Sequence, residues 1–177
     1  MIILKKFQNI PSLDKLTTAL SEADKASYCD ILRAINFSPK ELSKYSSWSE
    51  DYYTRNCILN CDKFELILIC WCRSHKTPIH DHGGEECWVK VISGQLEEVI
   101  YGKNENDELT VLRTLVSKKN QVTYMKDFMG FHSLENTSDK RSMTLHLYAK
   151  PIRKCNVFDE DSKTFINKEM VYHTIPD

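Results

Sequence analysis

The feature that most constrains the fold is a series of short strand-like segments after about residue 50. Each is rich in Val, Ile, Tyr or Phe and is bounded by Asn, Asp, Gly or Lys, a pattern typical of strands separated by turns. Turn residues stand at Ser93-Gly94 and at residues 103–107. This density of strands predicts a closed or sandwich-like β architecture. The expected strands are residues 52–59, 64–72, 87–92, 95–101, 109–115, 121–125, 143–148 and 171–175.

The first 50 residues have a different pattern, which is typical of helices. Ser12 is placed to cap a helix whose apolar residues Leu13, Leu16 and Leu20 share one face. A second apolar stripe follows at residues 28–35, and the capping-box sequence at residues 38–41 predicts a third short helix. We expect one domain over residues 1–177, with a helical layer at 1–48 packed on a β-barrel at 49–177.

Composition and charge argue against several classes of protein. The chain is 41% hydrophobic and 28% charged, as in ordinary soluble proteins. Its net charge of −1 gives no reason to expect a nucleic acid or a membrane surface as partner. The N-terminal run MIILKKFQNI is too short for a signal peptide or a membrane span. The seven cysteines are an odd number and predict reduced thiols, so we expect a cytoplasmic protein.

The strongest chemical signal is a pair of histidines two residues apart. His80 and His82 point to the same face if their segment is extended. Imidazole is the commonest metal ligand in proteins, so the pair predicts half of a metal site. His132 is the best candidate for a third ligand. His75 and His173 have no such partner motif, and we expect them on the surface or in packing roles.

The two histidine segments together resemble the cupin family. The cupin motifs are H-x-H followed by a glutamate and a glycine, and then glycine, histidine and x-x-x-N. Here they read Pro78-Ile79-His80-Asp81-His82 with Gly94, and Gly130-x-His132-x-x-x-Asn136. Cys87 stands in the place of the cupin glutamate, which leaves three histidines and no carboxylate. The resemblance implies a mainly β, cupin-type barrel (a jelly roll) with the N-terminal helices packed on it.

Cys87 and several further segments resemble the cysteine dioxygenase family within the cupins. The matching segments cover roughly residues 50–177, and they occur in the order that the family has. They are Tyr53-Thr54-Arg55-Asn56, Cys70-Trp71, Gly94-Gln95-Leu96, Thr144-Leu145-His146-Leu147-Tyr148, Cys155 and Phe158-Asp159.

This resemblance implies a thiol dioxygenase that converts L-cysteine and dioxygen to cysteine sulfinic acid. His80, His82 and His132 would hold a mononuclear ferrous ion through neutral imidazoles. Arg55 would bind the substrate carboxylate, because its planar donor fork suits a carboxylate. The remaining implied roles are a pocket wall at Tyr53 and Trp71, and a catalytic group of Tyr148, His146, Thr144 and Cys87.

Within that catalytic group, Thr144, His146 and Tyr148 resemble the family's Ser-His-Tyr row, with threonine in place of serine. The resemblance also implies a thioether bond between Cys87 and Tyr148. After Tyr148 the family has Ser-Pro-Pro with a cis peptide, whereas this chain has Ala149-Lys150-Pro151. A cis bond before Lys150 would cost about 3 kcal/mol. We therefore expect a trans peptide there, or a strained one.

Two alternatives stay open. One is a dioxygenase for 3-mercaptopropionate or a related thiol, and the other is a non-catalytic metal-binding cupin. Arg55 in its YTRN context and Cys87 favour cysteine. The co-occurrence of Arg55, His146 and Tyr148 argues against a binding module, which has no need for them. We expect a monomer.

Overall fold

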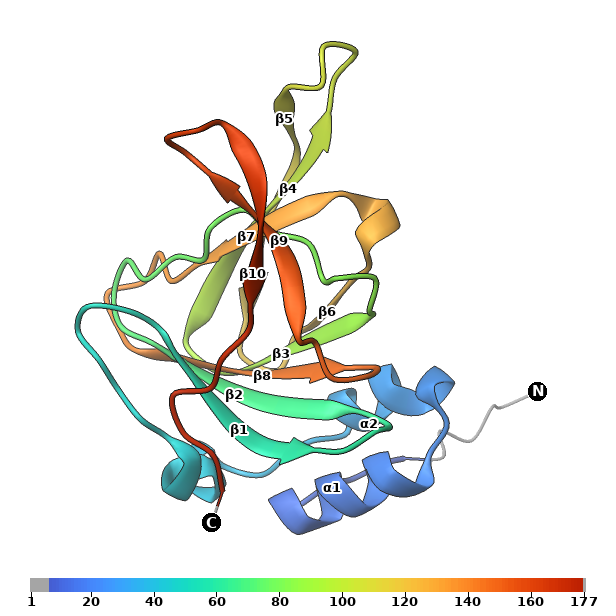
Figure 1. The fold of residues 1–177 in the computed structure, drawn as a ribbon. Coiled ribbons are helices and arrows are strands. Elements are labelled where there is room, and N and C mark those ends of the chain that lie inside the picture. The colour runs from blue at the N-terminus through green and yellow to red at the C-terminus, as the bar shows by residue number, and fades with distance from the viewer. Residues whose placement is uncertain (1–6, 177) are drawn as a thin grey trace.

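The computed structural model describes residues 7–176, and its centre is a barrel built from a larger and a smaller antiparallel sheet (Figure 1). The larger sheet has the strand order β1-β2-β8-β3-β6, the smaller sheet has β5-β4-β7, and β9 pairs with β10. The predicted mainly β barrel is therefore confirmed. The strands are β1 Thr54–Asn60, β2 Glu65–Trp71, β3 Cys87–Ser93, β4 Gln95–Lys103, β5 Leu109–Lys118, β6 Val122–Met125, β7 Phe131–Glu135, β8 Ser142–Tyr148, β9 Lys154–Asp159 and β10 Thr164–Glu169.

The predicted helices precede the barrel. They are α1 Leu13–Glu22 and α2 Tyr28–Arg33, with the 3₁₀ helices η1 Lys25–Ser27 and η2 Pro39–Tyr45, and a later one at η3 Asp127–Met129. Ser12 caps α1 by accepting the Lys15 N–H at 3.3 Å, as predicted. Ser38 caps η2, but Glu41 accepts the Leu13 N–H at 3.3 Å and ties η2 to α1.

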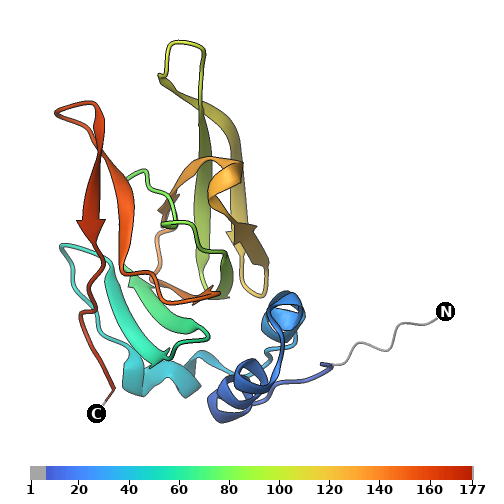
Figure 2. The ribbon, with the colours of Figure 1, turned by 45° about the vertical axis from the view of Figure 1, so that its right-hand side comes forward.

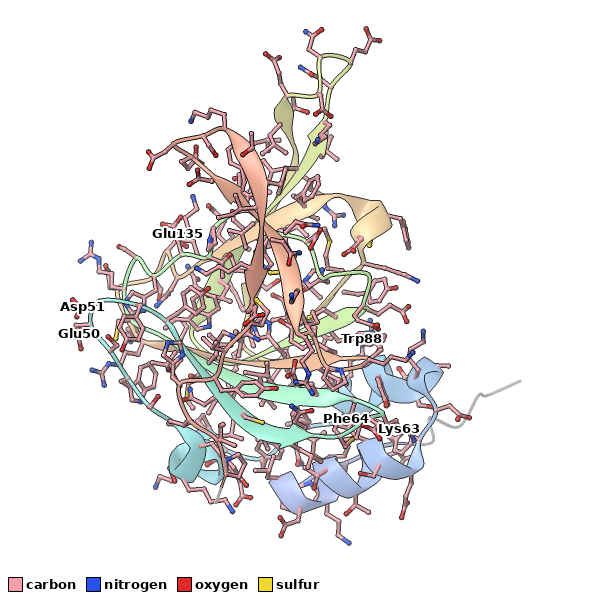
Figure 3. The ribbon with its side chains drawn as sticks, in the orientation of Figure 1. Glu50, Asp51, Lys63, Phe64, Trp88 and Glu135 are labelled. Atoms are coloured by element: carbon pink, nitrogen blue, oxygen red, sulfur yellow. The ribbon has the colours of Figure 1, made fainter. Side chains whose placement is uncertain are left out.

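The helices form a layer beneath the larger sheet (Figure 2). Tyr28 of α2 meets the rings of Phe64 and Trp88 edge-on, with centroids 6.1 and 5.6 Å apart. Figure 3 labels Phe64 and Trp88 on the helical side of the barrel. Edge-on aromatic pairs add to the apolar area that the layer buries.

The two central strands of the larger sheet are buried on both faces. In β2, Leu66, Leu68 and Cys70 pack toward the helices, while Ile67, Ile69 and Trp71 face the barrel interior. Every residue of β2 and β8 is buried. Side chains alternate along a strand, so alternate residues of β8 also enter the barrel. The outer face of this sheet packs against the helices and forms a hydrophobic core there. Polar functional side chains on the inner face therefore do not disrupt that core.

One expected strand is absent, and three observed strands, β7, β9 and β10, were not predicted as strands. Residues 171–175 form no strand; Thr174 makes an isolated bridge to Asn56. The ladder stops because the Arg55 N–H donates to the His173 imidazole instead of to a carbonyl. The hairpin of β9 and β10 was not predicted, because its residues are mostly polar and exposed. Strand β7 was predicted only as a histidine motif.

Two expectations concern the backbone and the chain's start. Residues 7–176 contain no cis peptide bond, so the peptide before Lys150 is trans, one of the two expected outcomes. The N-terminal apolar run includes residues 1–6, which lie outside the described residues. Among the helices of residues 7–176, none is long and apolar enough to cross a membrane.

Candidate active site

A cavity of about 360 Å³ opens between the inner face of the larger sheet and the β9–β10 hairpin. Its apolar wall includes Ile69, Leu134 and Val157. Its polar lining contains most of the residues that the sequence predicts for a site. These are Tyr53, Arg55, His80, His82, His132, His146 and Tyr148.

The three predicted metal ligands come together at this cavity. His80 and His82 lie in the loop between β2 and β3, and His132 lies on β7. The backbones of His80 and His132 exchange two hydrogen bonds, of 2.9 and 3.0 Å, which bring the loop against the strand. One ligand atom from each of the three residues lies within 4.8 Å of the others. The described residues contain no other such histidine, cysteine and carboxylate group.

Neighbouring groups orient two of the imidazoles toward a common point. Nδ1 of His80 donates to the Pro78 carbonyl at 2.9 Å. Nδ1 of His132 donates to the buried carboxylate of Glu98 at 2.7 Å. Each proton on Nδ1 leaves Nε2 as a free lone pair. Nε2 of His132 is buried and has no hydrogen-bond partner, as expected of an atom placed to bind a metal.

The electrostatics keep these imidazoles neutral. Burial lowers the pKa of His80, and it lowers the pKa of His82 and His132 well below the usual value. The neighbouring histidines lower the pKa of His82 and His132 further. Metals bind the neutral imidazole, so the cluster is ready to bind a divalent transition-metal ion. Three nitrogen ligands leave positions open for other molecules.

Glu98 is a functional candidate that the sequence did not reveal. It lies on β4, and its pKa is raised to about 7, chiefly by burial. In the sequence, Glu97-Glu98 is typical of a solvated pair of charges. The only available signal is that Glu98 alternates with Leu96 and Ile100, which both face inward.

Two aspartates hold the backbone of the histidine loop. Asp127 accepts the N–H groups of His82 and Gly84, at 2.8 and 2.5 Å. Asp81 accepts the N–H of Gly83 and two donors of Asn156 on β9. Asp81 therefore links the histidine loop to the β9–β10 hairpin. Both of its carboxylate oxygens already accept hydrogen bonds, which argues against a role as a catalytic base.

The catalytic row predicted on β8 has the expected alternation. Thr144 Oγ1 lies 3.0 Å from His146 Nε2, and the rings of His146 and Tyr148 are 6.3 Å apart. Burial lowers the pKa of His146 well below its usual value and raises that of Tyr148 well above its own. Both groups are therefore neutral at neutral pH. His146 and Tyr148 line the cavity, and Thr144 lies behind them.

Trp71 differs from its predicted place. It does not line the cavity but is fully buried behind Tyr53, with the two rings stacked at 5.0 Å. Its indole N–H donates to Thr144 at 2.9 Å. A buried indole N–H needs a hydrogen-bond partner, and Thr144, which does not line the cavity, supplies it.

Cys87 lies directly opposite Tyr148 in the pairing of β3 with β8. The thiol is fully buried, and burial raises its pKa while the Tyr148 hydroxyl lowers it. The predicted proximity of the two side chains is therefore present. Cys87 does not reach the cavity surface itself.

Arg55 enters the cavity from β1 as a buried cation. Its Nε donates to the Val171 carbonyl at 3.3 Å, and its Nη2 is buried without a partner. The expectation for His173 is wrong in one respect, because this residue lines the same cavity and contacts Arg55. His75 is a packing residue, as expected: it is buried and accepts the Cys72 N–H.

Comparison with known proteins agrees with this geometry. Residues 10–161 match the family model described as cysteine dioxygenase type I. A human protein, cysteine dioxygenase type 1 (Homo sapiens), is 30% identical over 148 residues, which are 81% of this chain and 74% of that protein. The protein of the same name from Danio rerio is 29% identical over 136 residues, 74% of this chain and 68% of that protein.

Solved structures confirm the architecture alone. A protein with a double-stranded β-helix domain from Klebsiella pneumoniae superposes with a TM-score of 0.51 at 16% identity. That match covers 61% of this chain and 80% of the other. The match to the family model covers most of the chain. The matched region contains all of the cavity-lining residues that the sequence analysis predicted for a site. The chain therefore belongs to the cysteine dioxygenase type I family.

Proposed function

We propose that this protein is a thiol dioxygenase that oxidises L-cysteine with dioxygen to cysteine sulfinic acid, using ferrous iron held by His80, His82 and His132. The observation that carries the proposal is the content of one buried cavity. Three neutral imidazoles with a free metal-binding nitrogen share it with an arginine whose Nη2 has no partner. Membership of the family and the names of the relatives support the reaction.

Ferrous iron, when bound, would supply the positions at which a thiolate and dioxygen meet. The chain's contribution is a neutral, buried ligand set. With three neutral imidazoles the ion keeps its full positive charge, so it would favour the thiolate form of the substrate.

Arg55 would fix the other end of the substrate. Cysteine carries a carboxylate, and the free Nη2 of Arg55 is a donor without a partner in a buried setting. A charge-assisted bond of this kind contributes about 1.5–3 kcal/mol. The carboxylate held at Arg55 and the sulfur held at the histidines would orient the substrate between them.

The row on β8 would hold protons at defined atoms. The Trp71 N–H can only donate, so Thr144 Oγ1 accepts from it and donates its own hydrogen to His146 Nε2. His146 is neutral and so carries its proton on Nδ1. Tyr148 is protonated, because burial raises its pKa. Its phenol would donate to the oxygen atoms being transferred, and the Cys87 thioether would fix its ring.

Oxygen uptake tests the proposal. The iron-loaded protein is given L-cysteine, cysteamine and 3-mercaptopropionate in parallel. We expect rapid uptake with cysteine and little with cysteamine, which lacks the carboxylate. Faster uptake with 3-mercaptopropionate would assign the site to that thiol instead. If none of the three thiols causes oxygen uptake, the proposal is wrong and the protein is a metal-binding cupin without this activity.

A further inference from the structure

Residues 170–174 form a segment that we name the C-terminal strap. In Figure 1 the chain leaves β10 and passes beside the ends of β1 and β2 before reaching the C-terminus. Met170, Val171 and His173 of the strap line the cavity. The strap lies outside residues 10–161, the region that the family model matches.

The strap holds the backbone of Arg55 on both sides. The Arg55 N–H donates to Nδ1 of His173 at 2.9 Å, and the His173 N–H donates to the Arg55 carbonyl at 2.8 Å. The neighbouring residue repeats the contact, because the Cys57 N–H donates to the Thr174 carbonyl at 3.0 Å. The ring of Tyr52 stacks on the His173 imidazole, with the ring centroids 5.1 Å apart.

The strap also holds the Arg55 side chain. Nε donates to the Val171 carbonyl at 3.3 Å, and the guanidinium also donates to the Tyr148 hydroxyl of β8, so the strap and β8 together orient its plane. Nη2 is left as the buried donor without a partner. A planar fork discriminates by geometry, so whatever sets its plane also sets how it meets a carboxylate.

A buried carboxylate anchors the strap from the other side. Glu65 of β2 is fully buried, and the Tyr172 hydroxyl of the strap donates to it. The Ile152 N–H also donates to Glu65, at 3.4 Å. Burial and Glu65 raise the pKa of Tyr172, so its hydroxyl keeps the proton that this bond needs. Leaving the buried Glu65 carboxylate without the Tyr172 hydroxyl would cost free energy. The hydrogen bond therefore holds Tyr172, and with it the strap, in place.

We infer that the C-terminal strap is the element that determines selectivity for carboxylate-bearing thiols, with His173 and Tyr172 as positioning residues that act through Arg55. The inference deepens the proposed function and rests on Arg55 as the carboxylate-binding group. The strap would aim Nη2 at the carboxylate and would have no effect on how sulfur reaches the metal.

Equilibrium binding separates this inference from the proposed function. Dissociation constants of L-cysteine and cysteamine are measured by calorimetry for the iron-loaded protein without oxygen, so no turnover is needed. His173→Leu removes the acceptor for the Arg55 N–H. We expect the dissociation constant of cysteine to rise about tenfold and that of cysteamine to stay unchanged.

Two matched variants control the measurement. His173→Asn offers an amide oxygen close to the position of Nδ1 and should restore cysteine binding. His75→Leu removes the same kind of contact, an N–H to Nδ1 bond of 3.0 Å from Cys72, but away from the cavity. It should leave both dissociation constants unchanged. Tyr172→Phe tests the anchor and should weaken cysteine binding in the same selective way.

Unchanged cysteine binding in His173→Leu would overturn the inference, and so would an equal loss of cysteine and cysteamine. If Tyr172→Phe bound cysteine normally, the anchor at Glu65 would be refuted. A wild-type protein that binds cysteine selectively but never oxidises it would contradict the proposed function and leave the strap's role supported.

Discussion

At the scale of single residues, the geometry of the site depends on the functional side chains and equally on the residues that hydrogen-bond to them and orient them. The imidazole of His132 is an example. Glu98 accepts a hydrogen bond from the Nδ1–H of His132, and this one contact determines which nitrogen faces the cavity. Hydrogen-bonded partners of this kind orient ligands before a metal binds.

Replacing Glu98 should therefore weaken metal binding without removing a ligand. We expect Glu98→Gln to lower iron affinity about 10–100-fold, because the amide lacks the charge and can present its N–H₂ to the ring. Iron affinity is measured by competition with a chelator. Glu97→Gln changes the neighbouring carboxylate on the other face of β4 and should have no effect. His132→Ala should bind no iron, and full iron content there would remove it from the ligand set.

Replacing Arg55 should affect substrate binding in particular. Arg55→Ala would remove the proposed charge-assisted contact with the substrate carboxylate, worth about 1.5–3 kcal/mol, so KM for cysteine should rise strongly. Arg55→Lys keeps the charge but loses the fork, and we expect it to recover only part of the loss. Steady-state kinetics of both variants test this. An unchanged KM in Arg55→Ala would exclude Arg55 from carboxylate binding.

At the scale of elements, strand pairing decides which side chains meet. The register of β3 on β8 sets Cys87 against Tyr148, and the register of β2 on β8 sets Glu65 on the other side of Tyr148. Side chains directly opposite in an antiparallel pair are close neighbours. The register of three strands therefore builds the surroundings of the phenol.

The family resemblance implies a thioether between Cys87 and Tyr148, and this pairing brings the two side chains together. A carbon–sulfur bond would form as the S–H and a ring C–H break, with dioxygen taking up the two electrons and two protons. Mass spectrometry after repeated turnover should show a form two hydrogens lighter. Cys87→Ser should lose the bond yet keep iron and part of the activity, and Tyr148→Phe should be the more damaging change. Free turnover without any lighter form would refute the bond.

The buried lysine of β3 gives an element-scale prediction about stability. Lys90 is buried under the helical layer, and its Nζ has no partner. Burial lowers its pKa below the usual 10.5. An unpaired ammonium is costly to bury, so Lys90→Met should raise the free energy of unfolding by about 1–3 kcal/mol at neutral pH.

The sign of the pH effect follows from that lowered pKa. Between the folded and the unfolded pKa, the unfolded chain holds a proton that the folded chain does not, so wild-type stability rises with pH there. The advantage of Lys90→Met should shrink as pH approaches 10.5. Denaturant unfolding at several pH values measures it, with the exposed Lys118→Met as control. No gain at neutral pH would show that Lys90 is not an unpaired charge.

The elements also show where sequence reasoning succeeds. Strands β2 and β8 were predictable because both of their faces are apolar or carry a recognisable motif. Strands β9 and β10 were not, because a hairpin that buries little needs few apolar residues. The three histidines predicted as ligands stand in recognisable motifs. Glu98, Tyr172 and His173 have no motif, and only long-range contacts make them part of the site.

At the scale of the whole molecule, the protein has two hydrophobic cores, and only one of them surrounds the cavity. The helices and the outer face of the larger sheet form one core, and the inner face forms a second, smaller core around the cavity. The site is assembled from β1, the loop before β3, β7, β8 and the C-terminal strap, which are far apart in sequence. Such a site needs the complete barrel, because each segment is positioned by a different neighbour.

One measurement tests the central claim most directly. The iron-loaded protein turns over L-cysteine under ¹⁸O₂, and the product is analysed by mass spectrometry. We predict cysteine sulfinic acid in which both sulfinate oxygens carry the label, formed in proportion to bound iron. Cystine as the only product, or a sulfinate with label in one oxygen or none, would contradict the assignment of a cysteine dioxygenase reaction to this cavity.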